Sequence, residues 1–288
     1  MQSIVRNSDF PASYDLDMLE RAYCQARSQE EKCELEQAIK ERGGPDHFHH
    51  LDAACLFVSR VQSSADYGKV RKAREFFARH QALGLSPFQL RGCRTVEQME
   101  GVLALQSRLA GGDLEGFYQG GVSLLGLGGC SVIVKRGMWE VLGGTALHLL
   151  EGEEELIKVG GYFRWKECRP ETTVVSIQGT QGTQAAQGAV WKRLGIHPGN
   201  ALLLLYLQVS RLLGQKRVRI RSSASVEYNQ MQEDSDLYLI PRNYFRLKAD
   251  AETGLYQLDA AQRDRILDKF SGKHAILADA FADLSARL

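Results

Sequence analysis

Apolar residues recur with helical spacing along the first third of the chain. The first such segment, residues 15–42, is rich in charged residues and ends at Gly43, Gly44 and Pro45. The last one begins with the T-x-x-Q pattern of a capping box, Thr95 and Gln98. We expect helices over residues 15–42, 51–61, 65–83 and from residue 95 to about 110. The pattern therefore predicts a helical N-terminal region over residues 1–112.

From residue 120 the spacing of apolar residues shortens toward two, and glycines separate short runs of β-forming residues. These runs predict an antiparallel meander over residues 122–127, 131–134, 139–142, 146–150 and 156–165, followed by a strand at 172–177. Further on, the pattern predicts helices at 185–194, 201–213, 260–270 and 274–288, and strands at 215–222, 237–240 and 243–248. Residues 113–288 are thus expected to form an α+β domain with a mixed, mostly antiparallel sheet and flanking helices.

Composition places the chain among soluble globular proteins. It has 44% hydrophobic and 25% charged residues, and its 36 basic and 35 acidic side chains leave a net charge of +1. A nucleic acid or an anionic membrane could therefore bind only to a local patch. The six cysteines form no C-x-x-C pair, which indicates reduced thiols. No apolar run reaches the roughly 18 residues of a membrane span, and residues 1–10 do not resemble a signal peptide, so we expect a cytoplasmic protein.

The best candidate for a ligand site lies between the strand at 172–177 and the helix that follows the G-I-H-P-G turn. Gln178 and Gly182 belong to a polar loop at the end of that strand, a common place for chemistry. Pro198 occupies the first position of a helix, with His197 as its N-cap. Free N–H groups at the helix start would suit a phosphate or carboxylate. The residues in this expectation are His197, Gly199, Asn200 and Ala201, and the alternative is an ordinary proline-started helix packed on the sheet.

Other side chains extend this hypothesis to catalysis and to nucleic acid. Glu227 and Tyr228 could act as base and acid, with Gln178 orienting a carbonyl group, or they could be a loop carboxylate and a half-buried ring. Two basic groups could contact phosphates: Lys69, Arg71 and Lys72 on a helix, and Arg217, Arg219 and Arg221 on one face of a strand.

Two further motifs predict ordinary structural roles. Three histidines between Asp46 and Asp52 lack the spacing of a helical zinc site, so we expect a surface loop there and no metal site. Cys130 follows two glycines, but no signature places a base beside it, and we expect a buried thiol.

Two stretches carry a resemblance to a known family. They read TTVVSIQGTQG at 172–182 and AVWKRLGIHPGNALLLLYLQVSRLLGQKRVRIRSS at 189–223. The chain resembles the VirK/YbjX family of bacterial proteins over about its last two-thirds, with His197 where that family usually has arginine and SSASVEYN where it carries a histidine. The family is linked mainly to virulence and envelope phenotypes. In element order the same stretches are also similar to the core of GNAT-type acyltransferases.

These observations suggest a transferase. The hypothesis is transfer of an acyl or aminoacyl group to a small-molecule amine from acyl-CoA, an acyl carrier protein or an aminoacyl-tRNA, with no tightly bound cofactor. The alternative is a non-catalytic ligand-binding or regulatory protein of the VirK/YbjX type, in which the same glycine-rich region serves recognition only.

Overall fold

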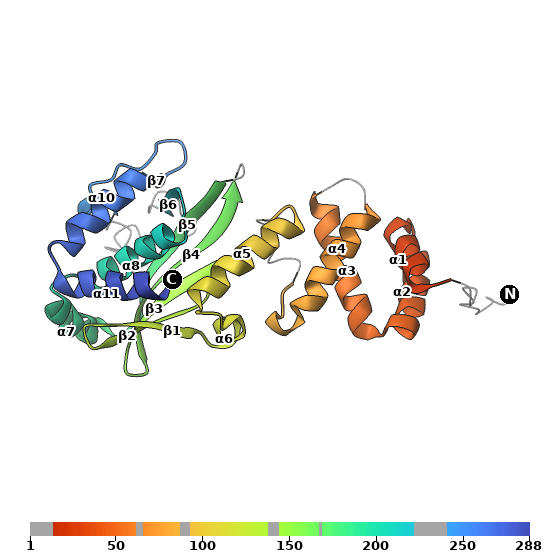
Figure 1. Cartoon of the computed structure of the whole chain (residues 1–288), viewed down its shortest axis with the longest axis horizontal. Coiled ribbons are helices and arrows are strands. Elements are labelled where there is room, and N and C mark those ends of the chain that lie inside the picture. The colour runs from red at the N-terminus through yellow and green to blue at the C-terminus, as the bar shows by residue number, and fades with distance from the viewer. Residues whose placement is uncertain (1–13, 62–65, 87–92, 138–143, 167–168, 222–240) are drawn as a thin grey trace. The chain divides into compact units, whose positions relative to one another are not determined.

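The computed structural model describes residues 14–61, 66–86, 93–137, 144–166, 169–221 and 241–288 (Figure 1). The chain divides into two compact units, Met1–Val96 and Glu97–Leu288. No helix within the described ranges has both the length and the apolar character needed to cross a membrane.

The first unit is helical. It consists of α1 (Leu16–Gln25), α2 (Gln29–Gly43), α3 (Pro45–Val61), α4 (Tyr67–Arg79) and a short 3-10 turn, η1 (Gln81–Leu83). The prediction of one helix over residues 15–42 is wrong, because the chain leaves the helix after Gln25 and starts a new one. Ser28 caps the new helix by accepting a hydrogen bond from the N–H of Glu31 at 3.1 Å. Ser28 and Glu31 have the S-x-x-E spacing of a helix start.

Helix α3 begins earlier than expected. Pro45 is its first residue, and the histidines between Asp46 and Asp52 lie in its first turns. The predicted surface loop is therefore wrong. The physical reason is that proline, which lacks an N–H and has φ fixed near the helical value, is well suited to the first position of a helix.

The second unit contains a single sheet. Among the described residues, seven strands follow one another in the order β1 to β7, and every neighbouring pair is antiparallel except β5 and β6. The predicted α+β class with a mostly antiparallel sheet is confirmed. The elements are α5 (Val96–Leu109), α6 (Leu114–Gln119), β1 (Val122–Leu127), β2 (Cys130–Arg136), β3 (Gly144–Glu151), β4 (Glu154–Lys166), β5 (Arg169–Gly179), α7 (Gln184–Leu194), α8 (Pro198–Leu212), β6 (Arg217–Arg221), β7 (Leu255–Asp259), α10 (Ala260–Ser271) and α11 (Ala275–Arg287).

The end of the sheet differs from the prediction. The expected strand at 243–248 is wrong: the chain there makes a helical turn and then an irregular segment, in which Arg246 has φ of 55° and the N–H of Leu247 donates to the carbonyl of Pro241. The last strand is β7, where Tyr256 and Leu258 are buried on one face. The strands expected at 139–142 and 237–240 lie outside the described residues.

The core of this unit lies between one face of the sheet and three helices. Helix α8 packs against β3, β4 and β5 and against α10 and α11, and Figure 1 shows these helices gathered beside the sheet. Its residues from Pro198 to Ser210 are all buried, as expected for a helix that is apolar nearly all round. Gly161 of β4 allows this close packing, because a Cβ there would lie 2.7 Å from the hydroxyl of Tyr206.

Candidate functional site

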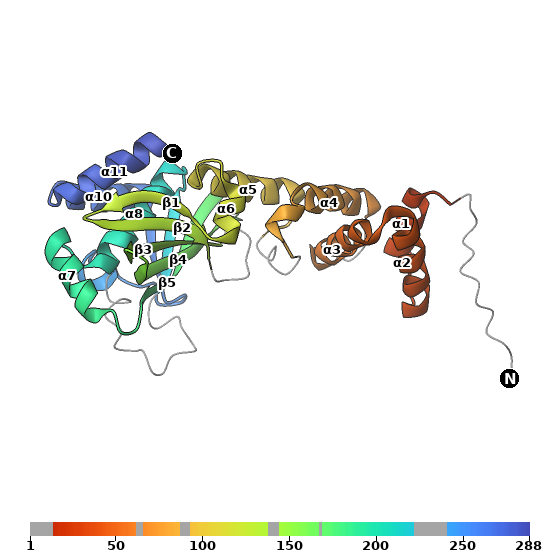
Figure 2. The same ribbon diagram turned by 90° about the horizontal axis from the view of Figure 1, so that it is seen from below.

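The face of the sheet opposite α8 carries many polar side chains, beside Ile133, Ala146 and Leu150. Alternation along the strands sends Leu147 and Val159 into the core, and therefore sends His148 and Lys158 to the other face. His148 pairs with Lys158, and Lys158 pairs with Gln178, so the three form one row across the sheet. The strands that carry them, β3, β4 and β5, lie side by side in Figure 2. We call this surface the polar sheet face. Its members are Lys135, His148, Glu155, Lys158, Glu171, Thr173, Ser176, Gln178, Arg217 and Arg219.

A histidine held by a carboxylate stands out on this face. His148 is 2% exposed, and its Nδ1 lies 2.5 Å from Oε2 of Glu155. Its Nε2 is buried and has no hydrogen-bond partner among the described residues. A carboxylate on Nδ1 favours the tautomer with its proton there, which leaves the lone pair on Nε2. The arrangement holds an imidazole in place with its second nitrogen able to accept a proton.

The surroundings of His148 keep it neutral. Burial lowers its pKa below the ordinary value of 6.5, because the charged ring would lose its hydration. Lys135 and Lys158, whose ammonium groups lie 3.9 and 4.0 Å from Glu155, lower the pKa further, while Glu155 acts in the opposite direction. At neutral pH His148 is therefore in the form that accepts a proton, as a general base requires.

The sequence prediction missed this pair. His148 lies in the apolar run A-L-H-L-L, and Glu155 returns beside it after the hairpin turn of Gly152. The available signal was one polar residue within a strand, with a carboxylate seven residues later across a tight turn. That spacing becomes a contact only when the hairpin register is known, because a shift by one residue would send the side chain to the other face.

A second group of polar atoms lies on the same face at β5 and β6. Glu171 is 5% exposed at its side chain, and its Oε1 lies 3.5 Å from Arg217 and 3.8 Å from Arg219. The Oγ1 of Thr173 and the Nε of Arg219 are buried without a partner among the described residues. The predicted alternation of β6 is confirmed: Val218 and Ile220 are buried, and the arginines, Arg221 included, lie on the other face. Glu171 offsets part of their charge.

The other residues predicted to contact phosphates belong to the helical unit. Lys69, Arg71 and Lys72 are exposed on α4, and Nε of Arg71 is 3.7 Å from Glu75 of the same helix. A nucleic-acid role for either basic group remains a prediction.

The start of α8 has the predicted cap. His197 is the N-cap and Pro198 the first helical residue. The expectation of free N–H groups needs correction, however, since the N–H of Gly199 donates to Nδ1 of His197 at 3.1 Å and that of Ala201 to the carbonyl of His197. The side chain of Asn200 is fully buried, and neither its Oδ1 nor its Nδ2 has a partner in the described part of the chain.

The loop after β5 contains the remaining predicted residues. Gln178 is exposed near the end of β5, and Gly182 has φ of +88° in the turn before α7, a conformation that favours glycine. Of the predicted site, the structure thus places Gln178 in one row with His148. Glu227 and Tyr228 lie outside the described residues.

Cys130 is buried, as predicted. Burial raises the pKa of its thiol, although Nη2 of Arg193 lies 3.4 Å from the sulfur. The thiol is therefore a weak nucleophile. In the described ranges no three histidine, cysteine or carboxylate side chains converge in the manner of metal ligands.

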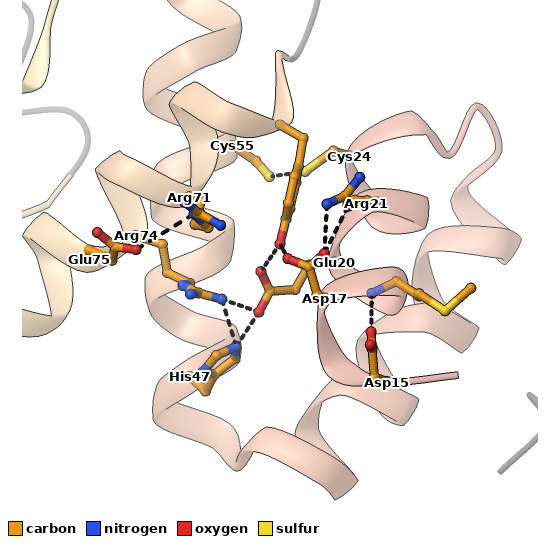
Figure 3. Close-up of polar contacts among 12 residues, drawn as sticks. Asp15, Asp17, Glu20, Arg21, Cys24, His47, Cys55, Arg71, Arg74 and Glu75 are labelled. Atoms are coloured by element: carbon orange, nitrogen blue, oxygen red, sulfur yellow. Dashed lines mark hydrogen bonds and ion pairs between the residues drawn. The ribbon is translucent and has the colours of Figure 1, made fainter. Parts of the chain in front are cut away.

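The helical unit has its own buried carboxylate (Figure 3). Glu20 of α1 is fully buried, and its carboxylate accepts hydrogen bonds from Arg74 and, at 2.8 Å, from the hydroxyl of Tyr67. His47 of α3 lies 2.6 Å from the same group. These contacts connect three helices and use both oxygens of Glu20, so the cluster is satisfied internally and leaves no group for a ligand.

No protein-family model matches the chain, and no curated protein matches it either. The resemblances to VirK/YbjX proteins and to GNAT-type acyltransferases therefore remain predictions from the residues.

Proposed function

We propose that the polar sheet face is a catalytic site for transfer of an acyl or aminoacyl group to an amine, with His148 as the general base. The observation that carries the proposal is the buried imidazole of His148, held at Nδ1 by Glu155 and left without a partner at Nε2 among the described residues. A buried unpartnered nitrogen is costly unless a substrate or another group completes it.

The chemistry needs a group of this kind. A neutral amine that attacks a thioester or ester carbonyl must lose a proton as the new C–N bond forms. Nε2 of His148 accepts that proton, and Glu155 stabilises the imidazolium that results. Gln178, two strands away in the same row, supplies an amide that can hydrogen-bond the acyl carbonyl or the acceptor.

The topology supports this class of reaction. β5 and β6 are parallel and are joined through α7 and α8, after a run of antiparallel strands. Their register ends at Val174 and Ile220, while β5 continues to Gly179. Ligands of α/β sheets bind beyond the carboxyl ends of parallel strands, and Gln178 lies at that end. The same element order occurs in GNAT-type acyltransferases, so this support is an analogy.

The activated donor belongs at the start of α8. Acyl-CoA, an acyl carrier protein and an aminoacyl-tRNA all carry phosphate groups, which the positive end of the α8 dipole attracts, although Asn200 is fully buried and the N–H groups of Gly199 and Ala201 are already bonded. Gly182, which is exposed in the turn before α7, allows a ligand to approach the backbone closely. For a tRNA donor, Arg217, Arg219 and Arg221 would add phosphate contacts.

A donor screen tests the proposal. The full chain is incubated with acyl-CoA thioesters, acyl carrier protein or aminoacyl-tRNA and a mixture of amines, and acylated products are identified by mass spectrometry. Thermal shift measured in parallel reports binding, since a ligand at 100 times its Kd stabilises by about 2.7 kcal/mol. Saturable product formation supports the proposal. Binding without any turnover would contradict it and would favour the non-catalytic, ligand-binding alternative.

A further inference from the structure

Two cysteines from different helices of the first unit lie in contact. Sγ of Cys24 on α1 is 3.5 Å from Sγ of Cys55 on α3, and Figure 3 shows the two side chains pointing toward one another. Both are half-buried, so a small molecule can reach them. Cys33 on α2 is exposed and belongs to the same unit, but its sulfur contacts only Gln29 among the hydrogen-bonding groups of the described residues.

The helices hold the pair in register. The hydroxyl of Tyr23, the residue before Cys24, donates to Asp52 of α3 at 3.0 Å. One turn earlier along α1, Glu20 contacts His47 of α3. The ring of Tyr23 packs edge-on against Phe48, with centroids 5.3 Å apart. These contacts, at Glu20 and at Tyr23 directly before Cys24, fix α1 against α3 and hold the two sulfurs close together.

We propose that Cys24 and Cys55 form a two-electron redox pair that hydroperoxides convert into an intramolecular disulfide between α1 and α3. The Cys24 thiolate attacks one oxygen of the peroxide, the O–O bond breaks, and Cys24 becomes a sulfenic acid while the other oxygen leaves as an alcohol or water. Cys55 then attacks the Cys24 sulfur, and the sulfenic hydroxyl leaves as water. Two thiols are oxidised, one peroxide is reduced, and a dithiol reductant reverses the step.

The environment assigns the two roles. The contact between the two sulfurs, in which either thiol can donate, lowers the pKa of Cys24 and raises that of Cys55. Lys32 acts on Cys24 in the same direction as this hydrogen bond, against burial and the charge of Glu20. We therefore assign Cys24 as the attacking thiolate and Cys55 as the resolving thiol. The disulfide itself is inferred from the contact between the two sulfurs and does not depend on this order. This pair does not depend on the proposed transfer reaction, because it belongs to the other unit.

Peptide mapping tests the proposal. The reduced full chain is treated with a few equivalents of hydrogen peroxide, remaining thiols are alkylated, and the digest is analysed without reduction. We expect a cross-linked peptide pair that contains Cys24 and Cys55, lost after treatment with dithiothreitol. The control is Cys33→Ser, the same substitution at another cysteine of the helical unit, and it should form the cross-link to the same extent as the wild type. Cys24→Ser and Cys55→Ser should not form it.

The order of attack has its own readout. In Cys55→Ser the sulfenic acid of Cys24 has no resolving thiol, so dimedone should label Cys24 there several-fold more than in the wild type. The proposal fails if peroxide oxidises the exposed Cys33 while Cys24 and Cys55 remain alkylated, or if disulfides connect the cysteines without preference. Wild-type mapping alone decides this point should a serine variant not fold.

Discussion

Two carboxylate–histidine pairs among the described residues have almost equal contact distances but differ in the hydrogen bonds of their remaining atoms. His47 and Glu20 are 2.6 Å apart, and His148 and Glu155 are 2.5 Å apart. The difference lies in the remaining atoms. Glu20 also binds Arg74 and Tyr67, and the cluster stabilises a helical packing. Nε2 of His148 has no partner among the described residues, which is why we propose a catalytic role for this second pair.

Glu155 should act on catalysis through His148. We expect Glu155→Gln to lower kcat about 10-fold or more, because the imidazolium loses the carboxylate that orients and stabilises it. Since Glu155 raises the pKa of His148, its removal should also move the acidic limb of the pH–rate profile to lower pH. In the wild type that limb should already lie below 6.5, because burial lowers the pKa of His148 from that value. A purely structural role would reduce the rate and leave the limb in place.

Glu20 should affect stability and not transfer. Its side chain is 1% exposed and faces Arg74, so Glu20→Gln leaves a largely buried guanidinium without its counter-charge, which costs about 3–5 kcal/mol of unfolding free energy. The matched control is Glu36→Gln. Glu36 pairs with Lys40 of the same helix, both side chains are more than one-third exposed, and the loss of this pair should cost about 0.5 kcal/mol or less. Urea unfolding of the full chain, followed by a spectroscopic probe located in the first unit, measures the loss of stability in both variants. Equal losses would contradict the assignment of Glu20 as the centre of the packing.

At the scale of elements, periodicity predicted most helices and strands, and its failures have local causes. The strand expected at 243–248 has an apolar and aromatic composition, yet the backbone of Arg246 adopts φ of 55° there, which a strand does not allow. β7 is short, and its neighbour β6 determines its pairing. The break between α1 and α2 depends on one cap at Ser28, which outweighs continuing helical propensity. These features depend on single residues or on partners distant in the sequence. The spacing of apolar residues, which is judged over a window of many residues, does not detect either.

The crossing of α8 over β4 depends on Gly161. An added Cβ would lie 2.3 Å from the carbonyl oxygen of Thr173 and 2.7 Å from the hydroxyl of Tyr206. We expect Gly161→Ala to destabilise the second unit by about 1–3 kcal/mol, because the sheet or the helix must shift. A Cβ added to Gly188 in α7 would meet no atom within 4 Å, so Gly188→Ala should stabilise by up to about 1 kcal/mol. Thermal unfolding compares the two, and a stabilising Gly161→Ala would show that the close packing is wrong.

At the scale of the whole molecule, the balanced charge limits what the chain can bind. With a net charge of +1, an aminoacyl-tRNA donor must be held by local groups such as Arg217, which is half-exposed and 3.5 Å from Glu171. If tRNA is the donor, Arg217→Gln should weaken binding equally for different tRNA sequences and reduce the slope of log K against log salt by about one. Filter binding at several salt concentrations measures this. A slope unchanged by the substitution would exclude the arginine from the donor site.

The sequence predicted the architecture better than the site. It predicted helices in the first third of the chain, a mostly antiparallel sheet further on and the cap of α8, because these follow from local patterns. It missed the contact between His148 and Glu155. It also expected free N–H groups at the start of α8, where the N–H of Gly199 in fact donates to His197. Both errors concern pairings, between strands or within a cap, that emerge only when the backbone is folded.

The most direct test of the central claim is the transfer rate of His148→Gln with the donor found in the screen. Glutamine keeps the approximate volume and polarity but cannot act as a base at neutral pH. With a folded variant and an unchanged KM for the donor, we predict a loss of about 10²–10⁴-fold in kcat, while His49→Gln, an exposed histidine of α3, should retain the wild-type rate. Turnover by His148→Gln at the wild-type rate would contradict the assignment of the polar sheet face as the catalytic site.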